Sequence, residues 1–201
     1  MKKLKSSLPN MLSVLTVIAV VAGAVLAYVN SVTAPQIEKI NADNLAAGIK
    51  AVMGSDDIQV SDPQDIDGFI VYDVTAGDND LGQAIVTTDK NGFGGPLKVL
   101  VGFDNEGTIL GYTVLEHAET PGLGAKAGDW FQKDGKGCII GKNPGKCNFT
   151  VSKDGGEIDA ITASTITSRA FLRSVKSAYD NIVAKSDGVS AATEQVNNEN
   201  D

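Results

Sequence analysis

A long apolar stretch near the N-terminus constrains this chain more than any other feature. From Met11 to Val29 the sequence reads MLSVLTVIAVVAGAVLAYV, and Ser13 and Thr16 alone break its apolar character. An α-helix rises about 1.5 Å per residue, so these 19 residues span roughly 28 Å, close to the ~30 Å hydrocarbon core of a bilayer. We therefore expect a transmembrane helix within residues 1–30.

The charges on either side of this stretch predict its orientation. Lys2, Lys3 and Lys5 precede it, and acidic residues dominate the sequence that follows. Cytoplasmic flanks of membrane helices carry an excess of lysine and arginine, so the N-terminus is predicted to lie in the cytoplasm. The chain would then be a single-pass membrane protein, with its C-terminal domain outside the cytoplasm.

A cleaved signal peptide is the alternative interpretation of the same stretch. Val25 and Ala27 would serve as the small residues before a cut after Ala27. However, the apolar run is longer than an ordinary signal-peptide core. Pro35 also follows closely, at the first turn of what reads as a continuing helix. These observations favour an uncleaved anchor.

The sequence after the anchor changes pattern twice. A partial apolar stripe predicts a helix that Gly54–Asp57 ends, and short alternating runs over 58–116 then predict β-strands. Within them, PLKVLVGF and TILGYTVLE flank DNEG, which predicts a hairpin with Asp104, Asn105 and Gly107 in its turn. A second amphipathic helix is expected from residue 162 to about Lys185, with Ile166 and Ala170 facing the core.

These elements predict an α+β fold, in which an antiparallel sheet packs against the C-terminal helix and the first helix. We expect four segments. Residues 1–30 form the cytoplasmic N-terminus and transmembrane anchor, and residues 31–57 a helical stalk. Residues 58–186 form the extracytoplasmic domain, and residues 187–201 a polar tail that is predicted to be disordered.

Charge and motifs exclude several classes of function. Of the 17 basic residues, three precede the anchor. The rest of the chain therefore has 14 basic and 25 acidic residues, which gives it a formal charge of −11. Such a surface repels nucleic acid, and no nucleic-acid partner is expected. The sequence has one histidine and no HExxH, nucleophile elbow, P-loop or dinucleotide fingerprint, so hydrolysis, phosphoryl transfer and zinc chemistry have little support.

The two cysteines leave one question open. Cys138 and Cys147 lie in GCIIGKNPGKC, a loop sequence rich in glycine and lysine. They could close a disulfide in an oxidising compartment or remain two unrelated thiols. Their spacing matches no zinc signature, so a metal site is not expected.

Two stretches could carry chemistry. In DAITASTITSRAF (159–171), five hydroxyls fall within seven residues at the start of a predicted helix. A helix N-terminus suits a phosphate, and hydroxyls there could bind one or be esterified by one; a redundant cap is the alternative. The second stretch, 92–126, contains GFGG and TPGLG. Its glycines allow the backbone to approach a flat ligand or another backbone, or simply form tight turns.

Taken together, these stretches resemble one family. NGFGGPLKVLVGFDNEGTILGYTVLEHAETPGLGAK, followed about 30 residues later by DAITASTITS, is similar to the FMN-binding domain of the Rnf and Nqr electron-transport complexes. The resemblance covers roughly residues 85–185. The single anchor and modest length look more like the G subunit of Rnf than the longer C subunit of Nqr.

The resemblance implies a covalently bound FMN. The family pattern is Asp, two residues, Ser/Thr, Gly/Ala, Ala, Thr, and its last threonine carries FMN as a phosphoester. Asp159, Thr162 and Ala163 match, Ser164 departs from the family's alanine, and Thr165 falls on the acceptor position. Thr162 is then expected to cap the helix, and Ser164 or Thr167 to touch the phosphate. The loop that matches the family's ring-contacting stretch comprises Glu119, Thr120, Pro121, Gly122, Leu123 and Gly124.

The resemblance also implies a function. The chain would be a flavoprotein subunit of an ion-translocating ferredoxin:NAD oxidoreductase, an electron relay with no complete active site of its own. Its partners would be the other membrane and peripheral subunits of that complex, with a flavin transferase needed for maturation. The alternatives are a stand-alone membrane-tethered flavoprotein, a subunit of a Na⁺-translocating quinone reductase, and a non-redox binding module with ordinary glycine loops.

Overall fold

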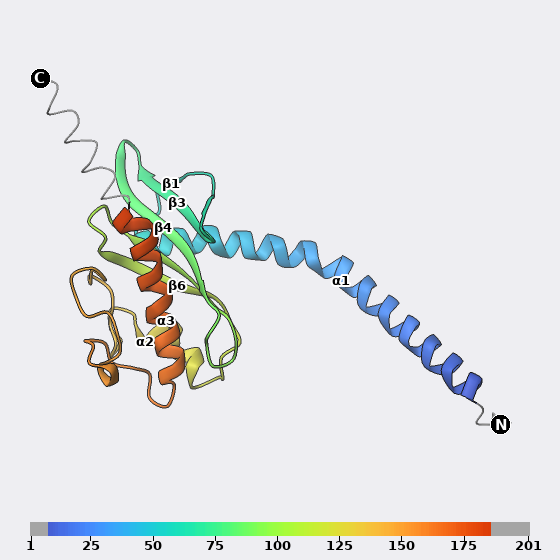
Figure 1. Cartoon of the computed structure of the whole chain (residues 1–201). Coiled ribbons are helices and arrows are strands. Elements are labelled where there is room, and N and C mark those ends of the chain that lie inside the picture. The colour runs from blue at the N-terminus through green and yellow to red at the C-terminus, as the bar shows by residue number, and fades with distance from the viewer. Residues whose placement is uncertain (1–7, 186–201) are drawn as a thin grey trace, which may run out of the picture. The chain divides into compact units, whose positions relative to one another are not determined.

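The first element is one long helix, α1 (Leu8–Met53), in the computed structural model of the chain, which describes residues 8–185 (Figure 1). The chain divides between Asn44 and Leu45 into two units, so α1 contributes to both. Pro35 lies inside this helix, which corrects the expectation that it stands in a first turn. The predicted polar tail, 187–201, lies outside the described residues.

The part of α1 before Leu45 has the surface of a membrane helix. Its large apolar residues, among them Leu12, Val20 and Leu26, are at least half exposed. The hydroxyls of Ser13 and Thr16 donate hydrogen bonds to the carbonyls four residues earlier, so they need no water. Within residues 8–185, α1 is the one helix long and apolar enough to cross a bilayer.

The second unit is built on an antiparallel sheet. Its strands are β1 (Gln59–Val60), β2 (Gln64–Ile66), β3 (Phe69–Ala76), β4 (Asn79–Asp89), β5 (Leu97–Phe103) and β6 (Ile109–His117). The order is β1-β3-β4-β5-β6, with β2 also paired to β3. All neighbours are antiparallel, so the predicted α+β fold is confirmed.

The predicted hairpin is the β5–β6 pair. Leu97 pairs with His117 and Gly102 with Gly111. In the turn, the carboxylate of Asp104 accepts hydrogen bonds from the N–H groups of Glu106 and Thr108. Gly107 supplies the positive φ of 76° that the turn needs, so the turn chemistry read from DNEG is confirmed.

Both faces of the sheet are covered. One face packs against the last turns of α1, where Ile49, Val52 and Met53 are buried with Val74 and Leu100. The opposite face packs against α3 (Thr165–Ala178), where Phe171 stacks on Phe131 at 4.4 Å between ring centroids. Three short elements lie between β6 and α3. They are the 3₁₀ turn η1 (Gly124–Lys126), the helix α2 (Ala127–Trp130) and a second 3₁₀ turn, η2 (Ser152–Asp154).

Helix α3 differs from its prediction at the start. It begins at Thr165, not at residue 162, and continues through a π-helical stretch, η3 (Tyr179–Val183), to the predicted end near Lys185. Ala170 is buried as expected, but Ile166 is 50% exposed, so the expectation that Ile166 faces the core is wrong. Ile166 is the second residue of α3 and so lies at the end of the helix, whereas Ala170 lies one turn further in.

The cysteine question is settled in favour of free thiols. Cys138 and Cys147 are both half-buried and unpaired with each other. The thiol of Cys147 donates to the carbonyl of Asn143. Burial, followed by the negative charge of Glu157, raises the pKa of Cys147. This thiol therefore stays protonated at neutral pH.

Candidate functional site

The N-terminus of α3 is shaped by a backbone turn that the hydroxyl count did not reveal. Ala163 has a positive φ of 62°, which is uncommon for a residue with a side chain, and Ser164 occupies the N-cap position. Thr162 is exposed and lies in the turn before the cap, so the assignment of Thr162 as the cap is wrong. The Ser164 hydroxyl makes no capping bond either.

Another hydroxyl fixes this turn from within the helix. Ser168, which is fully buried, accepts a hydrogen bond from the N–H of Ile161 at 2.9 Å and donates to the carbonyl of Ser164 at 3.0 Å. The hydroxyl thus ties the incoming chain to the first turn of the helix. Its role is structural, which explains one of the five clustered hydroxyls.

The helix start leaves three N–H groups available. Within the described part of the chain, no backbone or side-chain acceptor takes a hydrogen bond from the N–H groups of Thr165, Ile166 or Thr167. These groups and the helix dipole together favour a negative charge at this position.

A cavity of about 310 Å³ opens at this helix start. Three segments line it: the loop between β4 and β5, the loop that follows β6, and the first turn of α3. The lining residues are Phe93, Glu119, Thr120, Leu123, Gly124, Ala163, Ser164, Thr165, Ile166 and Thr167. The side chains of Phe93, Leu123 and Ile166 are each at least 41% exposed, so they offer apolar contact to a ligand.

Glu119 joins the three segments. Its side chain is 6% exposed, and Oε2 accepts a 2.8 Å hydrogen bond from the hydroxyl of Thr167, which is fully buried. Oε1 accepts a 3.3 Å hydrogen bond from the N–H of Gly94. One carboxylate therefore holds both glycine loops against α3.

The glycines make this close arrangement possible. A Cβ on Gly124 would touch Oε2 of Glu119 and lie 2.8 Å from Oγ1 of Thr167. A Cβ on Gly94 would collide with the carbonyl of Ala118. The sequence left open whether these glycines permit close approach or simply form tight turns. At Gly94 and Gly124 they permit close approach to neighbouring protein atoms. Gly122 differs from both, because its φ of 77° is the feature that favours glycine there.

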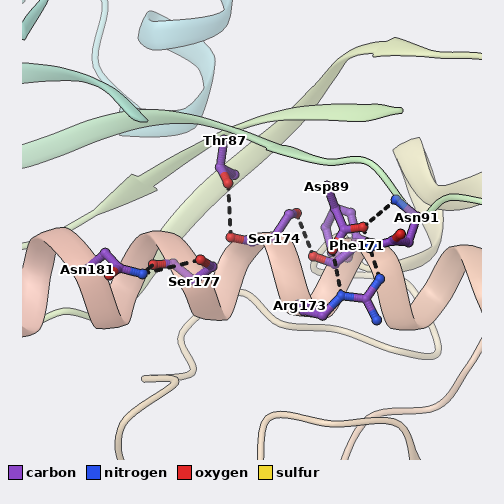
Figure 2. Close-up of polar contacts among 8 residues, drawn as sticks. All are labelled: Thr87, Asp89, Asn91, Phe171, Arg173, Ser174, Ser177 and Asn181. Atoms are coloured by element: carbon purple, nitrogen blue, oxygen red, sulfur yellow. Dashed lines mark hydrogen bonds and ion pairs between the residues drawn. The ribbon is translucent and has the colours of Figure 1, made fainter. Parts of the chain in front are cut away.

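An ion pair anchors the loop that carries Phe93. Asp89, at the end of β4, accepts two hydrogen bonds from Arg173 of α3 at 2.6 and 2.9 Å, as Figure 2 shows. Asp89 also accepts the N–H of Asn91 at 2.7 Å, and Thr87 donates to the carbonyl of Ser174 nearby. Burial alone would raise the pKa of Asp89, but the hydrogen bonds from Arg173 and Asn91 outweigh it and hold that pKa below its usual range.

Most of the residues predicted for the site meet at this cavity. Thr165, Ser164, Thr167, Glu119, Thr120, Leu123 and Gly124 all line it, whereas Thr162 and Gly122 do not. Phe93 and Ile166 also line it and were not predicted from the sequence. The position of Phe93 between the glycines of the first loop could have indicated that it belongs to the site. Ile166 had none, because its exposure depends on where the helix begins.

The arrangement offers a ligand two kinds of contact. The three free N–H groups suit an anionic group, and Thr165, which is half-buried, carries one of them and a hydroxyl. The apolar side chains of Phe93, Leu123 and Ile166 suit a flat, apolar body beside that anion. A phosphate joined to an aromatic ring system has both features.

Comparisons with known proteins agree with this chemistry. Residues 92–180 match the family described as FMN-binding domain. The chain is 39% identical over 112 residues to the G subunit of the ion-translocating oxidoreductase complex of Yersinia pestis, covering 54% of this chain and 53% of that protein. The same-named protein of Erwinia tasmaniensis is 32% identical over 180 residues, covering 81% of this chain and 83% of its own length.

The extent of these matches differs between relatives. With the Yersinia pestis protein, as with that of Escherichia coli at 38% identity, the chain spans about half the length of the relative it matches. With the Erwinia tasmaniensis protein the match extends over most of both chains. The chain therefore belongs to the family of ion-translocating oxidoreductase complex G subunits and contains that family's FMN-binding domain.

Proposed function

We propose that this chain is the flavoprotein subunit of an Rnf-type ion-translocating ferredoxin:NAD oxidoreductase, with FMN esterified through its phosphate to Thr165. The observation that carries the proposal is the position of Thr165. Thr165 lines the cavity in the first turn of α3, where three N–H groups have no protein acceptor among the described residues. Ser164 and Thr167 line the same cavity, but both are buried, whereas Thr165 is not.

The competing hydroxyls are occupied or misplaced. Thr167 is fully buried and donates to Glu119, and Ser168 is fully buried and bonded on both sides. Thr162 does not line the cavity. Ser164 lines it but is only 8% exposed, so Thr165 is the more accessible acceptor.

The rest of the cavity would hold the flavin ring. Leu123 and Phe93 would offer it apolar contact, and the loop from Glu119 to Gly124 would lie against it. FMN, when bound, accepts and donates electrons and so supplies the redox chemistry. The chain itself contributes orientation, through the cavity walls, and charge, through the helix start and Glu119.

The proposed setting is a membrane complex. Residues 1–30 would anchor the chain with its N-terminus in the cytoplasm, and the flavin domain would lie on the outer face of the bacterial inner membrane. Ferredoxin and NAD are cytoplasmic, so this subunit would exchange electrons with neighbouring membrane subunits rather than with either carrier. It would be a relay without a complete active site of its own. A flavin transferase would attach the FMN.

Intact mass tests the attachment. The chain is produced with and without a flavin transferase, and the expected mass gain is that of FMN less one water. The Thr165→Val variant keeps the side-chain volume nearly unchanged but removes the hydroxyl, so it should fold and carry no covalent flavin. Thr162→Val, at the exposed turn outside the cavity, is the matched control and should be loaded like the wild type.

Denaturing gel electrophoresis gives the second readout. Flavin fluorescence should remain with the wild-type and Thr162→Val chains and be absent from Thr165→Val. If Thr165→Val retains fluorescence, another hydroxyl is the acceptor and the assignment is wrong. A wild-type chain that stays colourless after coexpression would overturn the proposed function as a whole.

A further inference from the structure

A short turn lies against the N-terminus of α3. The 3₁₀ turn η2 (Ser152–Asp154) precedes the helix by about ten residues and is tied to the strand-like segment that leads into it. Val151 pairs with Ile158, and the N–H of Ser152 donates to the carbonyl of Ile158 at 2.8 Å. Its place beside the helix start is thus set by backbone pairing.

Ser152 and Asp154 tie this turn to its surroundings through their side chains. The hydroxyl of Ser152 donates to Asp159 at 3.2 Å, and the carbonyl of Asp159 accepts the indole N–H of Trp130 at 2.8 Å. Asp154 binds Arg169 of α3 through both of its oxygens, each at 2.7 Å. Arg169 stands four residues after Thr165, so both lie on one face of the helix.

These contacts bring the side chain of Lys153 within hydrogen-bond distance of Thr165. The ammonium nitrogen of Lys153 donates to Oγ1 of Thr165 at 3.2 Å. The neighbouring carboxylate of Asp154 is already occupied by Arg169. Within the described residues Lys153 forms no ion pair, so its charge is available at the hydroxyl proposed as the FMN acceptor.

We propose that Lys153 is a positioning residue that pairs with a charged phosphate oxygen of the group esterified to Thr165. This inference rests on the proposed function. A phosphodiester keeps one negative charge at neutral pH. The N–H groups of α3 and the ammonium of Lys153 would both donate hydrogen bonds to it.

The test compares matched charge removals in the full chain, solubilised in detergent. Lys153→Gln removes the proposed partner and Lys153→Arg keeps a positive charge. Lys146→Gln is the control: Lys146 is exposed and follows Gly145, which lies against Tyr179. Tyr179 is 14 residues after Thr165 in the sequence, which at about 1.5 Å per residue places the control roughly 21 Å along the helix axis from it.

Each substitution is made in the flavin-loaded wild-type chain and in Thr165→Val, which carries no phosphate. Urea unfolding is followed by fluorescence of Trp130, the single tryptophan. Lys153→Gln should lower the folding equilibrium constant about twofold to fivefold in the loaded chain and leave it unchanged in Thr165→Val, as expected for an exposed charge pair. The effect should shrink in high salt, and Lys153→Arg should restore most of it.

Phosphorus NMR supplies a readout that general stability does not affect. The ³¹P resonance of the loaded chain should move in Lys153→Gln and stay in place in Lys146→Gln. If Thr165 is loaded but neither the resonance nor the equilibrium constant responds to Lys153→Gln, this inference is wrong while the proposed function stands. If wild-type Thr165 is unmodified after coexpression with a transferase, both proposals fail.

Discussion

The hydroxyl of Thr167 donates a 2.8 Å hydrogen bond to the carboxylate of Glu119, across 48 residues of sequence. Both side chains are buried, and Glu119 also binds the N–H of Gly94. This pair is the point at which the loop after β4, the loop after β6 and helix α3 are fixed to one another. The shape of the cavity depends on it.

Replacing Thr167 by valine should destabilise the second unit. Valine preserves the volume but leaves Oε2 of Glu119 buried without its donor, at a cost of about 1–3 kcal/mol in the free energy of unfolding. Chemical unfolding followed by Trp130 fluorescence measures the change. Thr162→Val, at an exposed position, should stay within about 0.5 kcal/mol of the wild type. Equal effects of the two substitutions would contradict the role given to Thr167.

Replacing Gly124 by alanine should alter the environment of the bound flavin without releasing it. The new Cβ would push against Glu119 and Thr167, so the loop from 119 to 124 must shift. Because we propose that this loop lies along the ring, the absorbance maximum should move while the intact mass keeps its FMN. Gly128→Ala in α2, where a Cβ meets nothing within 4 Å, is the control. An identical spectrum in Gly124→Ala would count against the placement of the loop.

The Asp89–Arg173 pair should make stability depend on pH in the acid range. The pKa of Asp89 is lowered in the folded chain, so its stabilising contribution is complete above the unfolded pKa of about 4 and disappears as pH falls through the folded value. Asp89→Asn should cost about 1 kcal/mol at pH 7, discounted because Arg173 is half-exposed. Unfolding curves between pH 7 and 2 should show a smaller acid loss in Asp89→Asn than in the wild type. Parallel curves would contradict this account.

The mature chain should retain residues 1–30 and stay in the membrane after an alkaline carbonate wash. The apolar surface of α1 before Leu45 has no protein cover within its own unit, and lipid would cover it. N-terminal sequencing of the purified protein checks this directly. A sequence that starts at Tyr28 would establish the signal-peptide alternative instead.

The local features of the fold could be predicted because they depend on neighbouring residues. The β5–β6 hairpin follows from the DNEG turn, and the end of α1 follows from Gly54, which has a φ of 68°. The start of α3 could not be predicted in the same way. The positive φ of Ala163 and the two hydrogen bonds of Ser168 delay the helix by three residues, and both depend on contacts that no propensity scale contains.

The candidate site, too, could be predicted only in part from the sequence. Motif resemblance placed Thr165, Glu119 and Gly124 on one cavity, because a family pattern already records which distant segments meet. It did not reveal that Thr167 donates a hydrogen bond to Glu119, or that Lys153 donates one to Thr165. The first hydrogen bond joins residues 48 apart in the sequence and the second joins residues 12 apart. Both form only because the fold brings these segments close enough for their side chains to meet.

The packing of the end of α1 on the sheet limits where the chain can be divided. A Cβ on Gly111 would lie 2.7 Å from the carbonyl oxygen of Val52, and one on Gly102 would lie 3.0 Å from the same atom, so helix and strands touch backbone to backbone. Residues 45–53 therefore belong to the core of the second unit, as the strands of the sheet do. A water-soluble fragment for redox titration or crystallisation must begin at or before Leu45, because a cut at Gly54 would uncover one whole apolar face of the sheet.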